Sequence, residues 1–336
     1  MPTMKEIAKK ANVSVSTVSL VLNNKQSRIS KIKKEEIKQI AKEMNYTPNI
    51  AAVSLSKNIS FNVGLIVPDI TNPFFATLTK LIDQKLRIKG YSTLLVDSNN
   101  SFEIEKSTIN NMVARGVDGI ILVPSNEFFS ISIQKQKNLV KNCKKPLILL
   151  NAYTDLPVSY VNFDNVTGAY LATQELINYG HQNIAFIKGK KNFVNAKERL
   201  QGYKSALKDN QIKINSNIIF EGDYTLQAGY KLAPSIIKIK NITGIVSSND
   251  LMLFGIIKWA KSHYLDIFNR LSMVGFDNDP YSEIIEVPLT TIDQNPLGMV
   301  NNTIKLLMTM IIDKKSFISH SIIKPQLIKR QSVKKI

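Results

Sequence analysis

Several short apolar runs in this chain end in a carboxylate, an amide or a hydroxyl group. In open parallel α/β sheets such groups gather at the carboxyl ends of the strands, which is where ligands bind. Groups that accept and donate hydrogen bonds suit the hydroxyls of a small polyhydroxylated molecule. The sequence therefore predicts a binding site for a ligand of that kind. The strand-end residues are Asp69, Ser125, Asn126, Asn249, Asp250, Asp277 and Asn278.

The motifs that most enzymes need are missing from the 336 residues. The sequence contains no GxGxxG, GxxxxGK[ST], GxSxG or HExxH, and an SxxK match at 30–33 falls where a helix is predicted to begin. Cys143 is the only cysteine, and the histidines offer no cluster. We therefore expect no metal site, no cofactor and no enzymatic activity, with a cytosolic α/β sugar enzyme as an alternative.

The same apolar runs predict seven buried strands, and amphipathic helices lie between them. Continuous apolar strands that alternate with such helices are typical of parallel sheets covered on both faces. A break after the fourth strand predicts two similar doubly wound subdomains over residues 61–336. The predicted strands span residues 62–69, 92–99, 119–126, 146–153, 183–189, 243–250 and 271–278.

The first 47 residues have a different pattern, which predicts short helices. Thr3 can cap a first helix, and Glu6 three residues later completes a capping box. Asn12 tolerates the positive φ of a tight turn. Ser14 can then cap a second helix. Two short helices joined by a tight turn are the beginning of a helix-turn-helix arrangement.

A third helix is predicted from Ser30 to about Asn45, and it would support the first two. In a helix-turn-helix the second helix enters the major groove of DNA, where small hydroxyl and apolar side chains can meet base edges and thymine methyls. The alternative is a small three-helix bundle with an ordinary exposed helix. The predicted buried side of the third helix carries Ile32, Ile37, Ile40, Ala41 and Met44.

Positive charge is concentrated in the same part of the chain. The formal net charge is +18, and residues 1–60 hold 11 lysines and arginines against four acidic residues. That segment carries +7, which leaves +11 for the other 276 residues. A basic segment of this kind favours a polyanionic partner such as DNA. An AT-rich genome is an alternative source of part of this charge, because only six of the 44 basic residues are arginine.

The N-terminal sequence resembles the headpiece of LacI/GalR-family bacterial repressors. The matching stretches are "TMKEIAKKANVSVSTVSLVLNN", "MNYTPN" and "AAVSL", in that order. The resemblance implies a hinge helix within residues 48–60, whose Leu55 wedges into the minor groove of DNA. The DNA-binding residues that it implies are Thr3, Ser14, Val15, Ser16, Thr17, Ser19, Leu20, Asn23, Arg28, Tyr46, Asn49, Ala52 and Leu55.

Three residues depart from the pattern of that family. Asn12 replaces the usual glycine of the turn, and Val53 replaces a frequent hinge arginine. Leu20 stands where most members have an arginine that contacts guanine. Leucine can contact a thymine methyl instead, so we expect a different operator sequence at that base pair.

The resemblance continues through the rest of the chain, in the effector domain that this family shares with periplasmic sugar-binding proteins. Its motifs include "VPDITNPFF", "VNFDNVTGAY", "ERLQGY", "SSNDLMLFG", "MVGFDN" and "PLTTIDQ". Together with the strand-end Ser125, the motif positions imply a set of effector-binding residues, to which Asp164 is a weaker match. The set is Asn72, Phe74, Phe75, Ser125, Arg199, Asn249, Phe276, Asp277 and Gln294.

Some of these residues have an ordinary structural alternative. One of Phe74 and Phe75 is expected to belong mostly to the core. Arg199 could be a solvated helix charge beside Glu198, and Asp277 could cap the following helix.

The resemblance implies a homodimeric repressor that binds a palindromic operator and responds to a small effector. A pentose such as ribose is the first candidate; a hexose, a disaccharide, a nucleoside or a purine, and a phosphoprotein corepressor are alternatives. A transporter-type sugar-binding protein is the alternative function. Because the chain begins without a signal peptide and has no run of about 18 apolar residues, we expect a cytoplasmic protein with no membrane partner.

Overall fold

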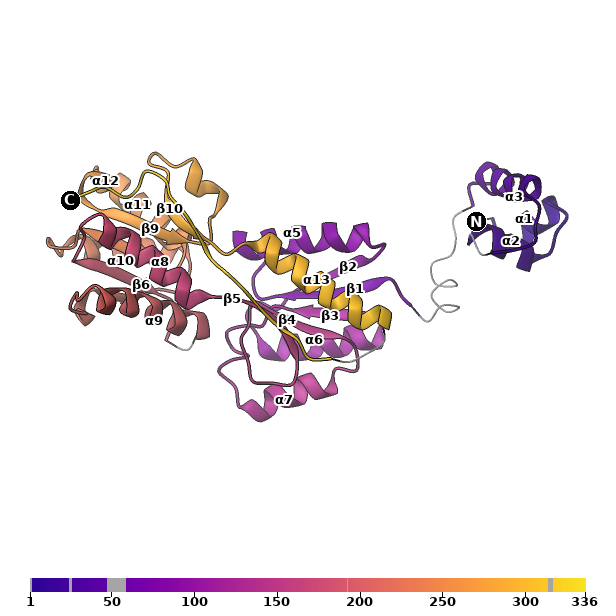
Figure 1. Ribbon diagram of the computed structural model, residues 1–336, viewed down its shortest axis with the longest axis horizontal. Coiled ribbons are helices and arrows are strands. Elements are labelled where there is room, and N and C mark those ends of the chain that lie inside the picture. Colours follow the sequence, from indigo (N-terminus) through magenta and orange to yellow (C-terminus); the bar gives the residue numbers. More distant parts are fainter. Residues whose placement is uncertain (1, 24–25, 47–58, 192, 314–316) are drawn as a thin grey trace. The chain divides into compact units, whose positions relative to one another are not determined.

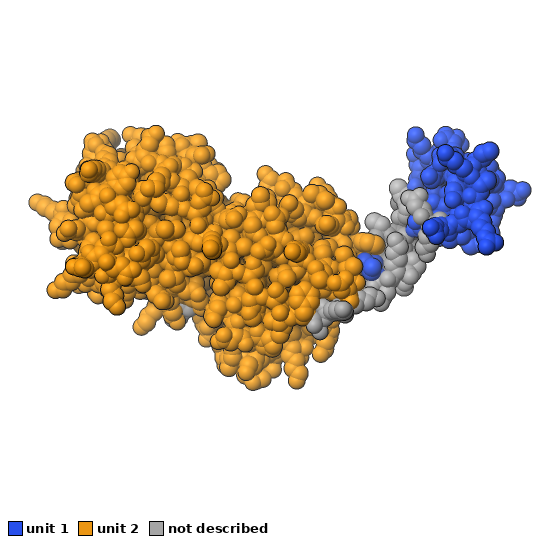
Figure 2. All heavy atoms as spheres, viewed as in Figure 1, with its two compact units in different colours: residues 1–60 blue, residues 61–336 orange. Residues whose placement is uncertain are grey.

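The computed structural model describes residues 2–23, 26–46, 59–191, 193–313 and 317–336. The chain forms two compact units, residues 1–60 and 61–336 (Figure 2). The predictions made for Asn49, Ala52, Leu55 and Val53 in the hinge lie outside the described residues.

The described residues of the first unit form three helices, and each begins just after its capping residue. Thr3 accepts a hydrogen bond from the Glu6 amide, and the Glu6 carboxylate accepts one from the Thr3 amide, so the capping box is confirmed. Ser14 caps the second helix by accepting from the Thr17 amide. Asn12 has a φ of 52°, as predicted for the turn. The helices are α1 (Met4–Lys10), α2 (Val15–Leu22) and α3 (Lys31–Glu43) (Figure 1).

A small apolar core holds these three helices together. Ile7 from α1, Val18 from α2 and Ile37 from α3 are fully buried in it. One core prediction is wrong: Ile32 is 84% exposed, because it lies in the first turn of α3 on the side away from the other helices.

In the second unit, the described residues form two six-stranded sheets flanked by helices (Figure 1). The strand orders are β11-β5-β4-β3-β1-β2 and β12-β10-β9-β8-β6-β7. Every pairing is parallel except that of β12 with β10, which confirms two doubly wound subdomains.

The elements of the first subdomain are β1 (Asn62–Val67), α5 (Pro73–Ile88), β2 (Ser92–Asp97), α6 (Phe102–Ala114), β3 (Gly119–Leu122), α7 (Ile133–Asn142), β4 (Leu147–Leu150), β5 (Ser159–Phe163), α13 (Pro296–Asp313) and β11 (His320–Ile323). Those of the second are α8 (Asn165–Asn178), β6 (Ile184–Lys188), α9 (Val194–Asp209), a 3-10 turn (Ser216–Ile218), β7 (Ile219–Glu221), α10 (Leu226–Ile237), β8 (Gly244–Ser247), α11 (Asp250–Ser262), α12 (Ile267–Arg270), β9 (Ser272–Phe276), a second 3-10 turn (Pro280–Glu283), β10 (Thr290–Asp293) and β12 (Gln326–Ile328).

The division between the subdomains lies one strand later than predicted. β5 pairs with β4 in the first sheet, and the chain enters the second subdomain only after Phe163. It returns to the first subdomain between β10 and α13, and crosses again between β11 and β12. Three crossings therefore connect the two subdomains beneath the facing strand ends. The seven predicted strands correspond to β1, β2, β3, β4, β6, β8 and β9, whereas β5, β7, β10, β11 and β12 were not predicted. β5 was missed because polar residues interrupt its apolar run, "SYVNF", although all five residues are buried.

Within the part of the chain that the structure describes, no helix is long and apolar enough to cross a membrane. The same residues contain no group of three or more histidine, cysteine, aspartate or glutamate side chains placed to hold a metal ion.

Candidate functional site

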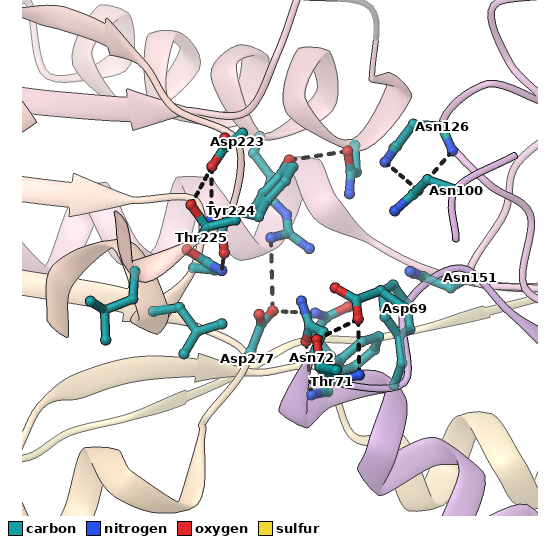
Figure 3. A pocket seen from close by; sticks show the side chains of 18 residues that line it. Asp69, Thr71, Asn72, Asn100, Asn126, Asn151, Asp223, Tyr224, Thr225 and Asp277 are labelled. Atoms are coloured by element: carbon teal, nitrogen blue, oxygen red, sulfur yellow. Dashed lines mark hydrogen bonds and ion pairs between the residues drawn. The ribbon is translucent and has the colours of Figure 1, made fainter. Parts of the chain in front are cut away.

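A cavity of about 250 Å³ lies where the loops at the strand ends of the two subdomains face each other (Figure 3). Residues of the first subdomain on its wall are Asp69, Thr71, Asn72, Phe74, Phe75, Asn100, Asn126 and Asn151. Residues of the second are Asn195, Arg199, Asp223, Tyr224, Thr225, Leu226, Asn249, Leu251 and Asp277, and Gln294 comes from a crossing segment. Seven of the nine predicted effector residues are among them.

Arg199 is the one cation among these lining residues, and it is held rigidly. Its side chain is 3% exposed, so it is not a solvated helix charge. Nε donates to the Asn165 side chain at 2.8 Å, and Nη1 donates to the backbone carbonyl of Ser248. The ring of Phe276 lies under the guanidinium. These contacts fix the plane of the guanidinium before any ligand arrives.

Asp277 and Gln294 form a hydrogen-bonded pair beside this arginine. The Gln294 amide donates to Asp277 Oδ1 at 2.5 Å, and the same oxygen lies 3.8 Å from Arg199 Nη1. Burial raises the pKa of Asp277 to about 7, although Arg199 and the hydrogen bond from Gln294 both lower it. The Gln294 Oε1 atom is buried and has no partner among the described residues. A ligand hydroxyl would satisfy that acceptor.

The "NPFF" segment forms the start of α5. Asn72 caps the helix by accepting from the Phe74 amide at 3.0 Å, which leaves its side-chain NH2 for the cavity. Phe74 is 8% exposed and belongs to the core of the first subdomain, as expected for one of the two rings. Phe75 is half-buried, and both rings line the cavity. An apolar ring face there suits the C–H surface of a sugar.

Two predicted effector residues do not line the cavity. Ser125 is fully buried, and its hydroxyl accepts from the Phe128 amide, so it holds the loop after β3 while Asn126 reaches the cavity. Phe276 is also buried, and it acts through Arg199 rather than on a ligand. Asp164, the weaker match, caps α8 through the Thr167 amide.

Asn249 lines the cavity, but both ends of its amide are engaged. Its oxygen accepts from the Met252 amide and caps α11, and its NH2 donates to the backbone carbonyl of Tyr224. It therefore positions the loop that carries Tyr224, and the second N–H of its NH2 is the donor left for a ligand.

Sequence reasoning missed two of the four asparagines of the first wall and one aromatic ring of the second. Asn100 and Asn126 hydrogen-bond to each other at 3.0 Å, and Asn151 lies next to them (Figure 3). The Tyr224 hydroxyl donates to the Asn195 side chain at 3.1 Å. The missed lining residues are Thr71, Asn100, Asn151, Asn195, Asp223, Tyr224, Thr225, Leu226 and Leu251.

Four residues that line the cavity have a left-handed backbone conformation. Asn100, Asn151, Tyr224 and Asp277 all have positive φ, which reaches 70° at Tyr224 and 101° at Asp277. Asparagine tolerates such angles, but tyrosine and aspartate at these values are uncommon. Residues held in this way cluster at ligand sites, where surrounding structure fixes the direction of their side chains.

In the first unit, α2 carries the exposed side chains predicted to contact DNA. Val15 is 44% exposed, Ser16 is exposed and Leu20 is half-buried. The Ser16 hydroxyl lies 2.7 Å from that of Ser14. The other predicted positions have local structural roles: Thr3 and Ser14 are helix caps, and the Asn23 side chain donates to the Ser19 carbonyl. Thr17 and Tyr46 are half-buried, and Arg28 is exposed.

A helix-turn-helix unit followed by a two-subdomain unit with a ligand cavity defines a ligand-responsive DNA-binding regulator. Residues 3–49 match the model of bacterial regulatory proteins of the LacI family, and residues 60–331 match that of periplasmic binding proteins and the sugar-binding domain of the LacI family. The chain belongs to the LacI family of DNA-binding transcriptional repressors. This membership favours a repressor over the transporter-type alternative.

The chain is similar to characterised repressors over most of its length. It is 32% identical to the ribose operon repressor of Halalkalibacterium halodurans over 94% of this chain and 92% of that protein. It is also 32% identical to the repressor CytR of Escherichia coli strain K12, over 87% of this chain and 84% of that protein.

Two solved structures of similar proteins contain a bound pentose. A LacI-family regulator from Enterococcus faecium with bound ribose is 28% identical, with a TM-score of 0.72 over 82% of this chain and 99% of that one. A periplasmic binding protein/LacI regulator from Alkaliphilus metalliredigens, complexed with D-xylulofuranose, is 26% identical, with a TM-score of 0.72 over the same shares.

Proposed function

We propose that this chain represses transcription as a homodimer on a palindromic operator, and that a small sugar, most simply a pentose, controls its operator affinity from the cavity. The observation that carries the proposal is the buried trio of Arg199, Asp277 and Gln294, with an acceptor that has no partner among the described residues. The ribose operon repressor and the two pentose-bound structures support a pentose. As a transcriptional regulator, the protein acts in the cytoplasm and has no catalytic role.

The effector works by changing the relation of the two subdomains. Each subdomain supplies one wall of the cavity, and three chain crossings connect them. A ligand that contacts both walls favours the arrangement in which both sets of contacts are made. By linkage, that preference changes operator affinity by the same free energy, commonly about 1–3 kcal/mol. Residues 48–60 would transmit the change to the paired headpieces.

The first test is calorimetric titration of the full-length protein with D-ribose. Wild-type protein should bind, and Asn126→Ala should bind about 5-fold more weakly, because it loses one hydrogen bond worth about 1 kcal/mol. Asn138→Ala, an exposed amide on α7, is the matched control and should bind as wild type does. Equal binding by both variants would show that Asn126, on the wall formed by the first subdomain, does not contact the ligand.

The second test links the ligand to DNA. Duplexes bound by the protein are first selected from a random pool, which should yield a palindrome. Anisotropy titrations of the selected duplex with and without D-ribose should then differ by about 5–150-fold in apparent affinity. Binding of D-ribose with no change in operator affinity would contradict control by this ligand.

A further inference from the structure

The two walls of the cavity present the same carboxylate arrangement to each other. Asp69 Oδ1 accepts from the amide and the hydroxyl of Thr71, two residues later. Asp223 Oδ1 accepts in the same way from the amide and hydroxyl of Thr225. In both aspartates Oδ2 has no hydrogen-bond partner among the described residues. Figure 3 shows the two groups on opposite sides of the cavity.

A third acceptor lies deeper in the cavity. The Gln294 side chain is 1% exposed, its NH2 is engaged with Asp277, and its Oε1 has no partner in the described part of the chain. A ligand that displaces water from these acceptors must replace the lost hydrogen bonds, and it can do so only by donating to them. Hydroxyl groups donate, whereas a phosphate dianion or a carboxylate only accepts.

The charges on the wall lead to the same conclusion. Of the charged residues that line the cavity, Arg199 is the one cation, and Asp69, Asp223 and Asp277 are the anions. Arg199 already faces Asp277 at 3.8 Å and donates to Ser248 and Asn165. The carboxylates of Asp69 and Asp223 therefore have no compensating cation among the described lining residues, and an anionic ligand would be repelled by both walls.

We infer that Asp69 and Asp223 act as a charge filter that admits uncharged, donor-rich sugars and rejects their phosphorylated and acidic forms. This inference rests on the proposed function, because it concerns the effector of the same cavity. Such a filter would let the protein distinguish the free sugar from the phosphorylated sugar that a kinase makes from it. A regulator with this filter would respond to a sugar that enters the cell without being phosphorylated.

The test compares neutral and phosphorylated members of three matched pairs by calorimetry with the full-length protein. The pairs are D-ribose and D-ribose 5-phosphate, D-glucose and D-glucose 6-phosphate, and adenosine and adenosine monophosphate. In the pair that binds, the phosphorylated member should bind at least about 30-fold more weakly than the neutral one. Added salt should reduce this difference in affinity, because it screens the repulsion between charges.

The variant that tests the filter is Asp69→Asn combined with Asp223→Asn. Asparagine keeps the Oδ1 acceptor for the threonine contacts, so the loops should retain their conformation while two charges are removed. The preference for the neutral ligand should fall about 10-fold. The control, Asp155→Asn with Asp313→Asn, removes two exposed carboxylates that do not line the cavity and should leave the preference unchanged.

The outcomes separate this inference from the proposed function. Tighter binding of a phosphorylated member would overturn the filter and leave the effector site intact. An unchanged preference in the Asp69 and Asp223 double variant would also overturn it. If no member of any pair binds the wild-type protein, the sugar site and the filter both fail.

Discussion

The Cζ atom of Arg199 lies 3.7 Å from the centre of the Phe276 ring. Phe276 ends β9 of the second sheet, and its ring meets that of Phe163, which ends β5 of the first sheet, edge to face at 5.6 Å. The guanidinium therefore rests on an aromatic pair that joins the two subdomains beneath the cavity. Movement of one subdomain against the other would shift the Phe276 ring and, with it, the guanidinium of Arg199.

Phe276→Leu should weaken D-ribose binding although Phe276 touches no ligand. A cation–π contact with a buried arginine contributes about 1–2 kcal/mol, so the loss should be about 5–30-fold in affinity, measured by calorimetry. Phe186→Leu is the control for loss of a buried ring in the same sheet, because Phe186 stacks on Tyr203 and not on the arginine. Equal losses in the two variants would show a general packing effect.

The affinity for D-ribose should depend on pH through Asp277. Burial raises the pKa of this carboxyl to about 7, and a sugar hydroxyl that donates to it favours the charged form. Affinity should therefore fall as the pH drops below about 7. Titrations at about pH 6 and about pH 8 test this, since they bracket that pKa. In Asp277→Asn the difference should be much smaller, and an unchanged pH dependence would assign it to another group.

The same raised pKa predicts the opposite trend for stability without ligand. The folded protein holds the Asp277 proton more tightly than the unfolded chain between about pH 4 and pH 7. In that window this group's contribution to stability decreases as the pH rises. Asp250, whose pKa burial also raises to about 7, titrates in the same window. The difference between denaturant curves of wild type and Asp277→Asn isolates Asp277, and parallel pH profiles would contradict this assignment.

Leu20→Ala should change which operator the protein prefers. A leucine against a thymine methyl makes an apolar contact, so its loss should reduce discrimination at one base pair per half-site by about 1 kcal/mol. The salt dependence of binding should stay the same, because no phosphate contact is lost. Ile32→Ala, an 84% exposed apolar residue on α3, is the control. Competition with single-base variants of the selected duplex measures both effects.

Much of the fold could be predicted from local sequence patterns. Thr3 and Ser14 each cap the helix that was predicted to start after them, because capping depends on residues within one turn. Ser30, predicted as the first residue of the third helix, is its N-cap. The prediction that Ile32 is buried was wrong because its position in the first turn of α3, rather than its apolar character, decides its burial. β5 was not predicted because a strand buried in the middle of a sheet does not need an unbroken apolar run.

The site was less predictable than the fold, for a physical reason. Strand ends identify which loops reach the cavity, but the direction of each side chain depends on the turn that follows. After β3 the turn buries Ser125 and presents Asn126. Asn100 and Tyr224 lie in loops of positive φ, and their approach to the cavity depends on contacts far along the chain.

Helix packing behind the second wall gives a further prediction. Gly255 of α11 lies against α10, where an added Cβ would be 2.0 Å from the Leu226 carbonyl oxygen. Gly255→Ala should force the helices apart and destabilise the protein by about 1–3 kcal/mol, measured by denaturant unfolding. α10 begins just after Tyr224, and α11 just after Asn249. The shift should therefore also lower the affinity for D-ribose. Lys258→Ala on the exposed side of α11 is the control, and matching stability of the two variants would contradict close contact between these helices.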